Sequence, residues 1–233
     1  MNEWSDPQLI DAYVTANADP ANNWYEREVN IPSILSLLPK GSNQRVLDFG
    51  CGPGGLTSLL SHVGVVQGAD ASPGMVNKAK ENYPEISFFV WDGASPLPTW
   101  VQPFNTIITK LALEFIADLD SLAHGLSEAL VADGQLIVSV THPILAATNG
   151  NMASYGSKVA SRTQIGTTGI YVDKFQHSIS AYINAFLQHG FVLEKVLEPT
   201  ISSELQASHH MDAAAGNLPK RLNLQFKKIV NKV

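Results

Sequence analysis

The chain has 233 residues, of which 45% are hydrophobic and 15% are charged, and it contains one cysteine. This length suffices to bury a hydrophobic core, and a lone cysteine excludes an intramolecular disulfide and any cysteine-rich zinc or iron–sulfur site. The formal net charge of −6 makes the chain a poor candidate for binding along a phosphate backbone, which needs a basic face, so we expect no nucleic-acid partner.

The sequence shows no targeting or membrane segment. No apolar run approaches the roughly 20 residues of a membrane-spanning helix. The chain starts with MNEWSD, which lacks the basic start and apolar core of a signal peptide. We therefore expect a cytoplasmic protein with no membrane partner, a monomer or dimer, whose residues 1–233 form a single domain.

Residues 1–43 are predicted to form an N-terminal helical cap, and from residue 45 onward short apolar strands alternate with helices. The predicted strands cover 46–49, 65–69, 86–91, 104–109 and 135–140, and the predicted helices cover 56–63, 73–83 and 119–131. Near-continuous apolar strands separated by helices are typical of a parallel sheet covered on both faces. The pattern predicts a doubly wound α/β fold.

The C-terminal part departs from this rhythm. Residues 141–177 are rich in Gly, Ser, Thr and Asn and lack a clear structural pattern, which favours a lid or binding loop. A helix over 179–189 and a strand over 191–198 follow. Residues 199–220 are again irregular, and a last strand covers 222–229. With no evident helix between them, the last two strands predict an antiparallel edge, and both irregular segments are predicted to lie on the substrate side.

The turn after the first predicted strand is rich in glycine. Gly50, Gly52 and Gly55 satisfy the dinucleotide pattern G-x-G-x-x-G, which makes a nicotinamide-dependent oxidoreductase one alternative. Asp48, Gly50, Gly52 and Gly54 satisfy D-x-G-x-G-x-G as well. A carboxylate at this strand end is unfavourable beside a pyrophosphate. It suits a ligand that carries an ammonium group and no phosphate.

Two further carboxylates repeat this position in the sheet. Asp70 ends the second strand 22 residues after Asp48, and Asp92 follows the third strand after another 22 residues. An ionised carboxylate has two acceptor oxygens, so Asp70 can accept both hydroxyls of a ribose, and Asp92 can accept an adenine amine. Together the three acids indicate a phosphate-free adenosine that bears a cationic amino acid.

At these residues the chain resembles the class I S-adenosylmethionine-dependent methyltransferases, and most closely the small-molecule branch that includes ubiquinone- and menaquinone-type enzymes. The resemblance rests on Val46–Gly55, Gly68–Met75 and Trp91–Gly93. It implies a Rossmann-like, mostly parallel seven-stranded sheet with an antiparallel last strand. It also implies S-adenosylmethionine as cofactor and methyl transfer to O, N or C of a small molecule. A binder of this cofactor that does not methylate is a second alternative, and no metal is expected.

The resemblance also implies roles for single residues. Asp48 and the backbone of Gly50 and Gly52 would hold the methionyl portion. Cys51 lies among these contacts, with a side chain that we expect to pack under the turn. Asp70, Ala71 and Met75 would hold the ribose and flank the adenine, whose edge Asp92 and Gly93 would bind. Leu111 would lie near the sulfonium, and Tyr25 and Arg27 would contact the cofactor from the N-terminal segment.

Candidates for the acceptor side are fewer. His142 directly follows the fifth strand and is the leading candidate for a base or for a residue that orients the acceptor, because histidine titrates near neutral pH. A histidine that only caps the strand end is the alternative. His177 is expected to face solvent at a helix start. Relatives often carry a histidine where this chain has Glu114, which we expect to be solvated or near the cofactor rather than a base.

Overall fold

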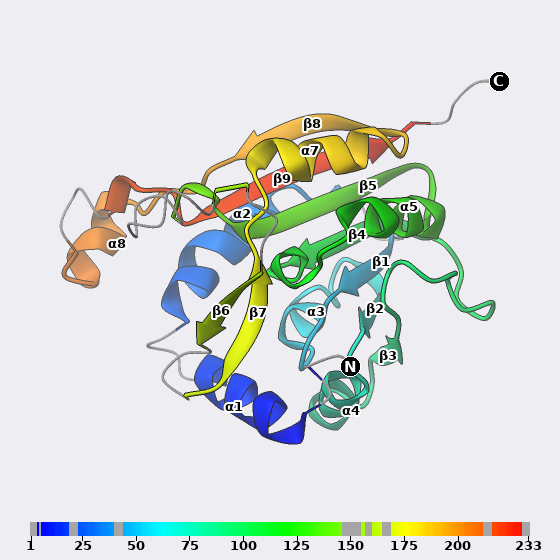
Figure 1. The fold of residues 1–233 in the computed structure, drawn as a ribbon, viewed down its shortest axis with the longest axis horizontal. Coiled ribbons are helices and arrows are strands. Elements are labelled where there is room, and N and C mark those ends of the chain that lie inside the picture. The colour runs from blue at the N-terminus through cyan, green and yellow to red at the C-terminus, as the bar shows by residue number, and fades with distance from the viewer. Residues whose placement is uncertain are drawn as a thin grey trace.

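A computed structural model describes residues 4, 6–18, 23–39, 44–145, 155–156, 160–164, 169–211 and 216–229. Its central sheet contains β1 (Gln44–Phe49), β2 (Gly64–Asp70), β3 (Ser87–Val90), β4 (Phe104–Lys110), β5 (Leu130–Thr141), β8 (Phe191–Leu197) and β9 (Arg221–Lys228). The strand order is β3-β2-β1-β4-β5-β9-β8 (Figure 1). The first five strands pair in parallel, and β9 pairs antiparallel with both β5 and β8. The predicted mostly parallel seven-stranded sheet with an antiparallel last strand is confirmed.

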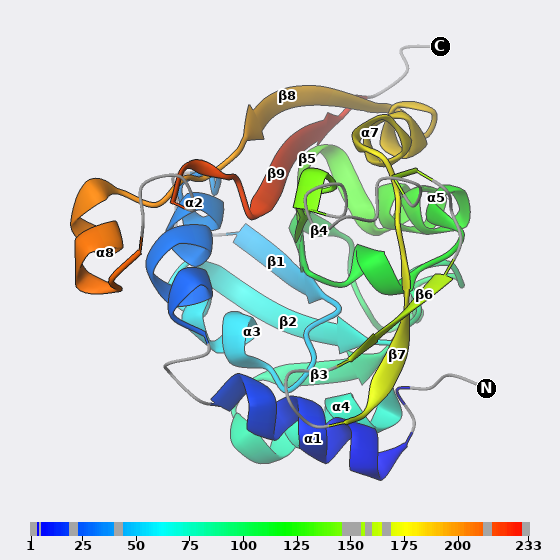
Figure 2. The ribbon, with the colours of Figure 1, turned by 60° about the vertical axis from the view of Figure 1, so that its left-hand side comes forward.

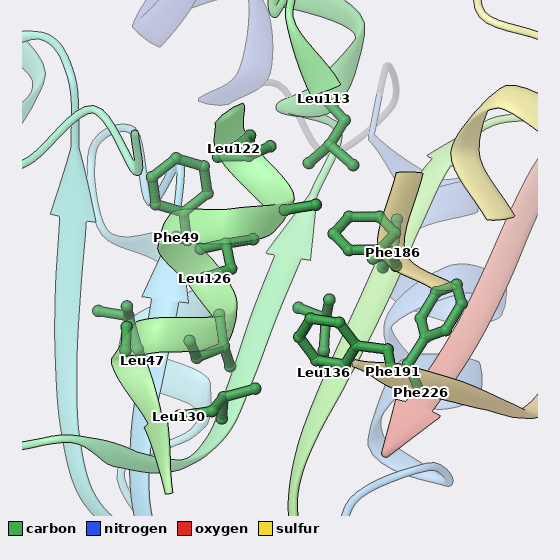
Figure 3. Packing of buried hydrophobic residues seen from close by; sticks show 14 of the residues in the cluster. Leu47, Phe49, Leu113, Leu122, Leu126, Leu130, Leu136, Phe186, Phe191 and Phe226 are labelled. Carbon is green, nitrogen blue, oxygen red and sulfur yellow. The ribbon is translucent and has the colours of Figure 1, made fainter. Parts of the chain in front are cut away.

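Both faces of the sheet are covered, because successive residues of each buried strand point to opposite sides. Leu47 and Phe49 of β1 pack in one hydrophobic cluster with α5 (Leu119–Ala129) and α7 (Ile179–Leu187). Figure 3 shows Leu122 and Leu126 of α5 beside these two residues. On the opposite face, Val46 packs in a second cluster with residues of α2 (Ile31–Leu35) and α3 (Gly55–Leu59).

The order of the strands creates a switch point between β1 and β4. From β1 the chain moves outward through β2 and β3 and then returns to the other side of β1 as β4. In open α/β sheets, ligands bind in the crevice that such a reversal leaves at the carboxyl ends of the strands. Helix α4 (Pro73–Asn82) lies along β2 and β3, and α1 (Pro7–Ala18) contacts α4 beside this crevice (Figure 2).

The segment 141–177 contains structure that the sequence pattern did not predict. Strands β6 (Ala160–Gln164) and β7 (Tyr171–Phe175) pair antiparallel in a small separate sheet. This pair is largely polar, so it lacks the apolar run by which the other strands were recognised. In both ribbon views β7 runs towards α1, and it contacts the short 3-10 turn η3 (Leu113–Phe115). Residues 146–154, 157–159 and 165–168 of the expected lid lie outside the described residues.

The predicted N-terminal helical cap and the irregular segment 199–220 both contain short helices. The N-terminal cap holds α1, the π-helical turn η2 (Glu26–Asn30) and α2, while residues 1–3, 5, 19–22 and 40–43 lie outside the described part. Segment 199–220 contains α8 (Ser203–Ser208), and its residues 212–215 lie outside as well. None of the helices in the described ranges combines the length and apolar character that a membrane crossing requires.

Candidate functional site

A cavity of about 310 Å³, here called the first cavity, opens at the carboxyl ends of β1 to β4. Most of the predicted cofactor contacts line it, namely Gly50, Gly52, Asp70, Ala71, Met75, Asp92 and Leu111. Tyr25, Arg27, Asp48, Cys51 and Gly93 are not among its lining residues. The crevice of the sheet is therefore the place where most of the predicted residues come together.

Asp70 is held in place by two backbone amides. Its Oδ2 accepts from the Gly52 amide at 2.9 Å, and its Oδ1 accepts from the Ser72 amide at 2.9 Å. Burial raises the pKa of Asp70, and these two hydrogen bonds offset part of the rise. Because a carboxylate offers about four acceptor positions, both oxygens keep one for a ligand. This geometry suits a pair of neighbouring hydroxyl groups.

The amide groups of the glycine loop are already engaged. Gly50 and Cys51 both donate to the Ala69 carbonyl, at 2.8 and 3.0 Å, and Gly52 donates to Asp70. These three residues therefore have no amide left for a phosphate, which disfavours a dinucleotide. Gly50 has a φ of 73°, and a Cβ there would lie 2.3 Å from the Ala112 Cβ, so only glycine fits this close approach.

Asp48 and Cys51 lie beneath the loop rather than in the first cavity. The buried Asp48 accepts a hydrogen bond from the Thr57 hydroxyl at 2.6 Å, and burial raises its pKa to about 6. Cys51 packs with Val76 and Phe88, as expected, and burial raises the pKa of its thiol. In this geometry the Asp48 carboxylate ties β1 to α3 through Thr57, and its predicted role towards the methionyl group stays a prediction.

Asp92 and Gly93 form the rim beyond β3. The exposed Asp92 uses Oδ1 to accept from the amides of Ala94 and Ser95 and from the Ser95 hydroxyl. Its small burial raises the pKa of Asp92, but these hydrogen bonds outweigh that effect and lower it. At Gly93 a Cβ would lie 2.7 Å from the Phe49 ring, so this glycine allows close packing behind the rim.

Tyr25 and Arg27, the two cofactor contacts predicted in the N-terminal segment, do not line the first cavity. Tyr25 is buried and donates its hydroxyl to the Pro199 carbonyl at 2.9 Å, and Arg27 is exposed. Between them, Glu26 turns inward and pairs with Arg221 at 2.7 Å and with Lys110 at 3.4 Å. Burial raises the pKa of Glu26, but these two cations outweigh it and lower the pKa overall.

Two aromatic residues of the first cavity were missed by the sequence reasoning. Trp4 and Tyr13 line it, with their rings edge to face at a centroid distance of 5.3 Å. Trp4 also meets the Phe115 ring at 5.1 Å, and its carbonyl accepts a hydrogen bond from the Ser72 hydroxyl. The sequence carries no signal for either residue beyond the predicted helical cap over 1–43, which does not indicate what the cap covers.

Tyr13 lines the first cavity, and its pKa is raised by burial and by nearby negative charges. Burial, followed by the nearby carboxylates of Asp70, Glu26, Glu114 and Asp48, raises the pKa of Tyr13 to about 12. The same negative field that disfavours a phenolate favours a cation. The first cavity is thus suited to a positively charged ligand.

Leu111 marks the wall of the first cavity after β4. It has a φ of 56°, a left-handed conformation that is rare outside glycine, and its amide donates to the Ser139 carbonyl at 2.8 Å. Such strained backbone is concentrated at functional sites.

Comparisons with known proteins agree with this site. Residues 46–134 match the family model described as "Methyltransferase domain". A solved S-adenosylmethionine-dependent methyltransferase from Mesorhizobium loti has a TM-score of 0.66 at 21% identity, over 84% of this chain and 96% of that one. Residues 46–134 thus match a methyltransferase domain, and the chain has the fold of solved S-adenosylmethionine-dependent methyltransferases. The predicted methyltransferase activity agrees with this match and with the names of the curated relatives, whereas the individual site residues stay predictions.

Some curated relatives of this chain are enzymes that are named for the molecule they methylate. The trans-aconitate 2-methyltransferase of Methylobacterium nodulans is 27% identical over 73% of this chain and 73% of its own length. That of Variovorax paradoxus is 33% identical over 50% of this chain and 46% of its own length. Both are named for a small molecule, in line with the predicted small-molecule class, although the resemblance in the motifs pointed towards quinone-type enzymes.

A second cavity of about 240 Å³ lies beside the η3 turn and the end of β5. Glu114, Thr141, His142, Lys174, His177 and Tyr182 are among the residues that line it. The expectation that His177 faces solvent is wrong, because His177 is buried, with 3% exposure. Of the two expectations for Glu114, solvation is wrong for the same reason, and a position near the cofactor stays a prediction. His177 lies within hydrogen-bond distance of the Ile116 carbonyl, at 2.8 Å, and the tertiary packing of η3 and β7 covers it.

His142 reaches the predicted edge of the sheet, but both of its ring nitrogens are engaged. Its Nδ1 accepts from the Ile144 amide at 3.1 Å, which places the proton on Nε2. That Nε2 lies 2.7 Å from Glu198 Oε1 and donates to it. His142 thus connects the turn after β5 to Glu198. Both of its ring nitrogens are occupied by these hydrogen bonds, so neither is open to accept a proton from a ligand.

Proposed function

We propose that this methyltransferase binds S-adenosylmethionine in the first cavity, with the ribose on Asp70 and the adenine towards Asp92. The observation that carries the proposal is the Asp70 carboxylate, which two amides orient and which keeps acceptor positions on both oxygens. When bound, the cofactor supplies a methyl group on a positively charged sulfur. The residues of the chain position it and exclude water.

The charge and the engaged amides of the site support this ligand over a nicotinamide dinucleotide. The carboxylates of Asp70 and Asp92 line the first cavity and no Lys or Arg does among the described residues, so the first cavity favours a cation. The backbone amides of Gly50, Cys51 and Gly52 already donate to Ala69 and Asp70, so they offer no hydrogen-bond donors to a pyrophosphate. A ligand with an ammonium group, a sulfonium and no phosphate matches both features.

Calorimetric titration with S-adenosylhomocysteine tests the cofactor site, with NADH as the comparison ligand. We expect saturable binding of S-adenosylhomocysteine and none of NADH. Absence of binding at millimolar S-adenosylhomocysteine would overturn the proposal. Transfer of a labelled methyl group to an acceptor then separates an enzyme from a protein that only binds the cofactor.

We propose a small organic molecule as the methyl acceptor. The curated relatives are named for trans-aconitate, and the second cavity of about 240 Å³ admits only a small compound. The net charge of −6 supports the expectation that nucleic acid is not a partner. Trans-aconitate and a short duplex DNA, each incubated with labelled cofactor, are the first acceptors to compare. The oligomeric state, the single-domain organisation and the cytoplasmic location stay predictions.

For His142 we propose the acceptor-orienting role rather than that of a base. The residue holds the turn after β5 through Ile144 and Glu198, and it lines the second cavity without an unoccupied ring nitrogen. Transfer kinetics of a Glu198 variant test this role, as described in the Discussion.

A further inference from the structure

Three aromatic rings from separate segments of the chain line the first cavity. Trp4 precedes α1, Tyr13 lies on α1, and Phe115 lies on η3. The Trp4 ring meets the Tyr13 ring at a centroid distance of 5.3 Å and the Phe115 ring at 5.1 Å, with interplanar angles of 89° and 77°. Aromatic rings favour this edge-to-face arrangement, so the three rings support one another around Trp4.

The Tyr13 ring is available to a ligand in the first cavity. An edge-to-face contact covers at most one face of a ring, and Trp4 makes the one ring contact of Tyr13 within the described part of the chain. Tyr13 is only partly buried, and it lines the first cavity. A ligand in this cavity can therefore reach the π system of Tyr13.

Tyr13 also lies beside the glycine loop and Asp70. A Cβ on Gly52 would lie 3.9 Å from Tyr13 Cε1, at ordinary van der Waals distance, and the Gly52 amide donates to Asp70 Oδ2. The carboxylate of Asp70 contributes to the raised pKa of Tyr13, so its charge reaches the ring. Under the proposed function, Asp70 holds the ribose and the Gly52 backbone holds the methionyl portion. The sulfur of the cofactor joins these two portions, which places it beside Tyr13.

The position of these rings is fixed relative to Asp70. The Trp4 carbonyl accepts a hydrogen bond from the Ser72 hydroxyl, and the Ser72 amide donates to Asp70 Oδ1. Ile10 of α1 packs so closely on Gly74 at the start of α4 that a Cβ there would overlap its side chain. Ser72 thus holds the aromatic residues and the Asp70 carboxylate in one arrangement.

S-adenosylmethionine and its product S-adenosylhomocysteine differ at the sulfur. The donor has a positively charged sulfonium, whereas the product is a neutral thioether, and both have the same ammonium group. A carboxylate such as Asp70 attracts every positive group of the ligand. An aromatic ring attracts a cation only over its face and within about 6 Å, so it acts on the charge beside it. A ring beside the sulfur therefore distinguishes the donor from the product.

We propose that the Tyr13 ring binds the positive charge on the sulfur of the methyl donor, with Trp4 and Phe115 holding the ring in place. The inference rests on the proposed function and deepens it by naming a residue that recognises the sulfonium. Tyr13 stabilises the charged donor and does not stabilise the neutral product. Loss of the charge on methyl transfer removes this contribution, which favours exchange of the product for a new donor.

Calorimetric titrations without acceptor test the inference, with S-adenosylmethionine and S-adenosylhomocysteine as ligands of the wild type and of Tyr13→Leu. Leucine is apolar like the ring but has no aromatic face. We expect Tyr13→Leu to lower the affinity for S-adenosylmethionine about tenfold, within the range of a desolvated cation–π contact, and to leave the affinity for S-adenosylhomocysteine within about twofold. Sinefungin, which has a protonated amine in place of the methylated sulfonium, should behave like S-adenosylmethionine.

Tyr13→Phe separates the ring from the hydroxyl. Phenylalanine keeps the ring, so the affinity for S-adenosylmethionine should stay within about threefold of the wild type. Trp100→Leu is the matched control, because the exposed Trp100 also makes an edge-to-face contact, with Phe89 at 5.3 Å, and does not line the first cavity. Its affinities for both ligands should be unchanged. A loss in Tyr13→Phe as large as in Tyr13→Leu would assign the effect to the hydroxyl and overturn the inference.

Two other results would also overturn it. Equal losses of both affinities in Tyr13→Leu would show that the ring only closes the cavity, and unchanged affinities would show that the ring does not act on the sulfur. Thermal unfolding checks that each variant folds. Trp4→Leu is a second variant in case Tyr13→Leu does not fold, and it should change the ratio of the two affinities in the same direction but less. If the wild type binds neither ligand, the proposed function itself fails, so the two failures are distinguishable.

Discussion

The two cavities are built in different ways. The predicted residues of the first cavity lie between Gly50 and Leu111, on the turns that follow β1 to β4 and at the start of α4. The second cavity combines Glu114, the end of β5 and the segment from Lys174 to Tyr182, which meet only after the chain has folded. The comparison teaches that most of the first cavity is built from turns that directly follow strands, whereas the second cavity depends on the packing of distant segments.

The two cavities meet at η3 and the residues just before it. Ala112 packs against Gly50 of the loop, and Glu114 bonds the Thr141 amide on the acceptor side. A change at Gly50 therefore disturbs both cavities, whereas a change at Asp70 or Glu198 should disturb one. Four substitutions follow, from the largest expected effect to the smallest.

Gly50→Ala should have the largest effect. The new Cβ would lie 2.3 Å from the Ala112 Cβ at a residue whose φ is 73°. Left-handed backbone and overpacking together cost about 4 kcal/mol, so we expect a loss of that size in the free energy of unfolding. Chemical denaturation measures it, and S-adenosylhomocysteine affinity should fall as well.

The double variant Gly50→Ala/Ala112→Gly checks the cause. Removing the Ala112 methyl relieves the contact and leaves only the backbone cost, so about half of the lost stability should return. No recovery would show that the wall formed by Ala112 does not set the position of the loop.

Asp48→Asn should change how stability depends on pH. The ordinary pKa of 3.8 is raised to about 6 in the folded protein, so stability is fully present below pH 3.8 and falls as the pH rises through 6. Asparagine stays neutral, so the variant should gain about 3 kcal/mol relative to wild type between pH 4 and pH 7. Urea denaturation across this range measures the difference, and a constant difference would show that Asp48 ionises normally.

Asp70→Ala should weaken cofactor binding while the fold persists. It removes two hydrogen bonds from ligand hydroxyls to a carboxylate, so S-adenosylhomocysteine affinity should fall about hundredfold. Calorimetry measures the loss, and Asp70→Asn, which keeps one acceptor oxygen, should lose less. An unchanged affinity would remove Asp70 from the cofactor site.

Glu198→Gln should have the smallest effect. The Glu198 side chain is 52% exposed, and glutamine can still accept from His142 Nε2, so we expect a loss of about 1 kcal/mol in stability. Transfer rates should stay within about threefold if His142 orients its neighbours. A fall of more than tenfold would instead indicate that His142 acts as a base supported by Glu198.

Much of the fold could be predicted from the sequence, because buried parallel strands are apolar runs and the helices between them begin at recognisable residues. Ser72 and Pro73, for example, start α4 with the Ser72 hydroxyl accepting from the Met75 amide. The β6–β7 pair was missed because its residues are polar. Trp4 and Tyr13 were missed because a helical pattern does not indicate which cavity the helix covers.

By itself, the sequence determined the glycine-rich turn and the carboxylates that follow successive strands, and with them the family and its cofactor. Both depend on short stretches of backbone, which one strand and one turn define. Only the tertiary structure decided that Asp48 lies beneath the loop and that the loop amides are engaged. It also decided that Glu114 is buried with one unsatisfied oxygen. Burial and hydrogen bonding depend on which distant segments pack together, and no short motif records that.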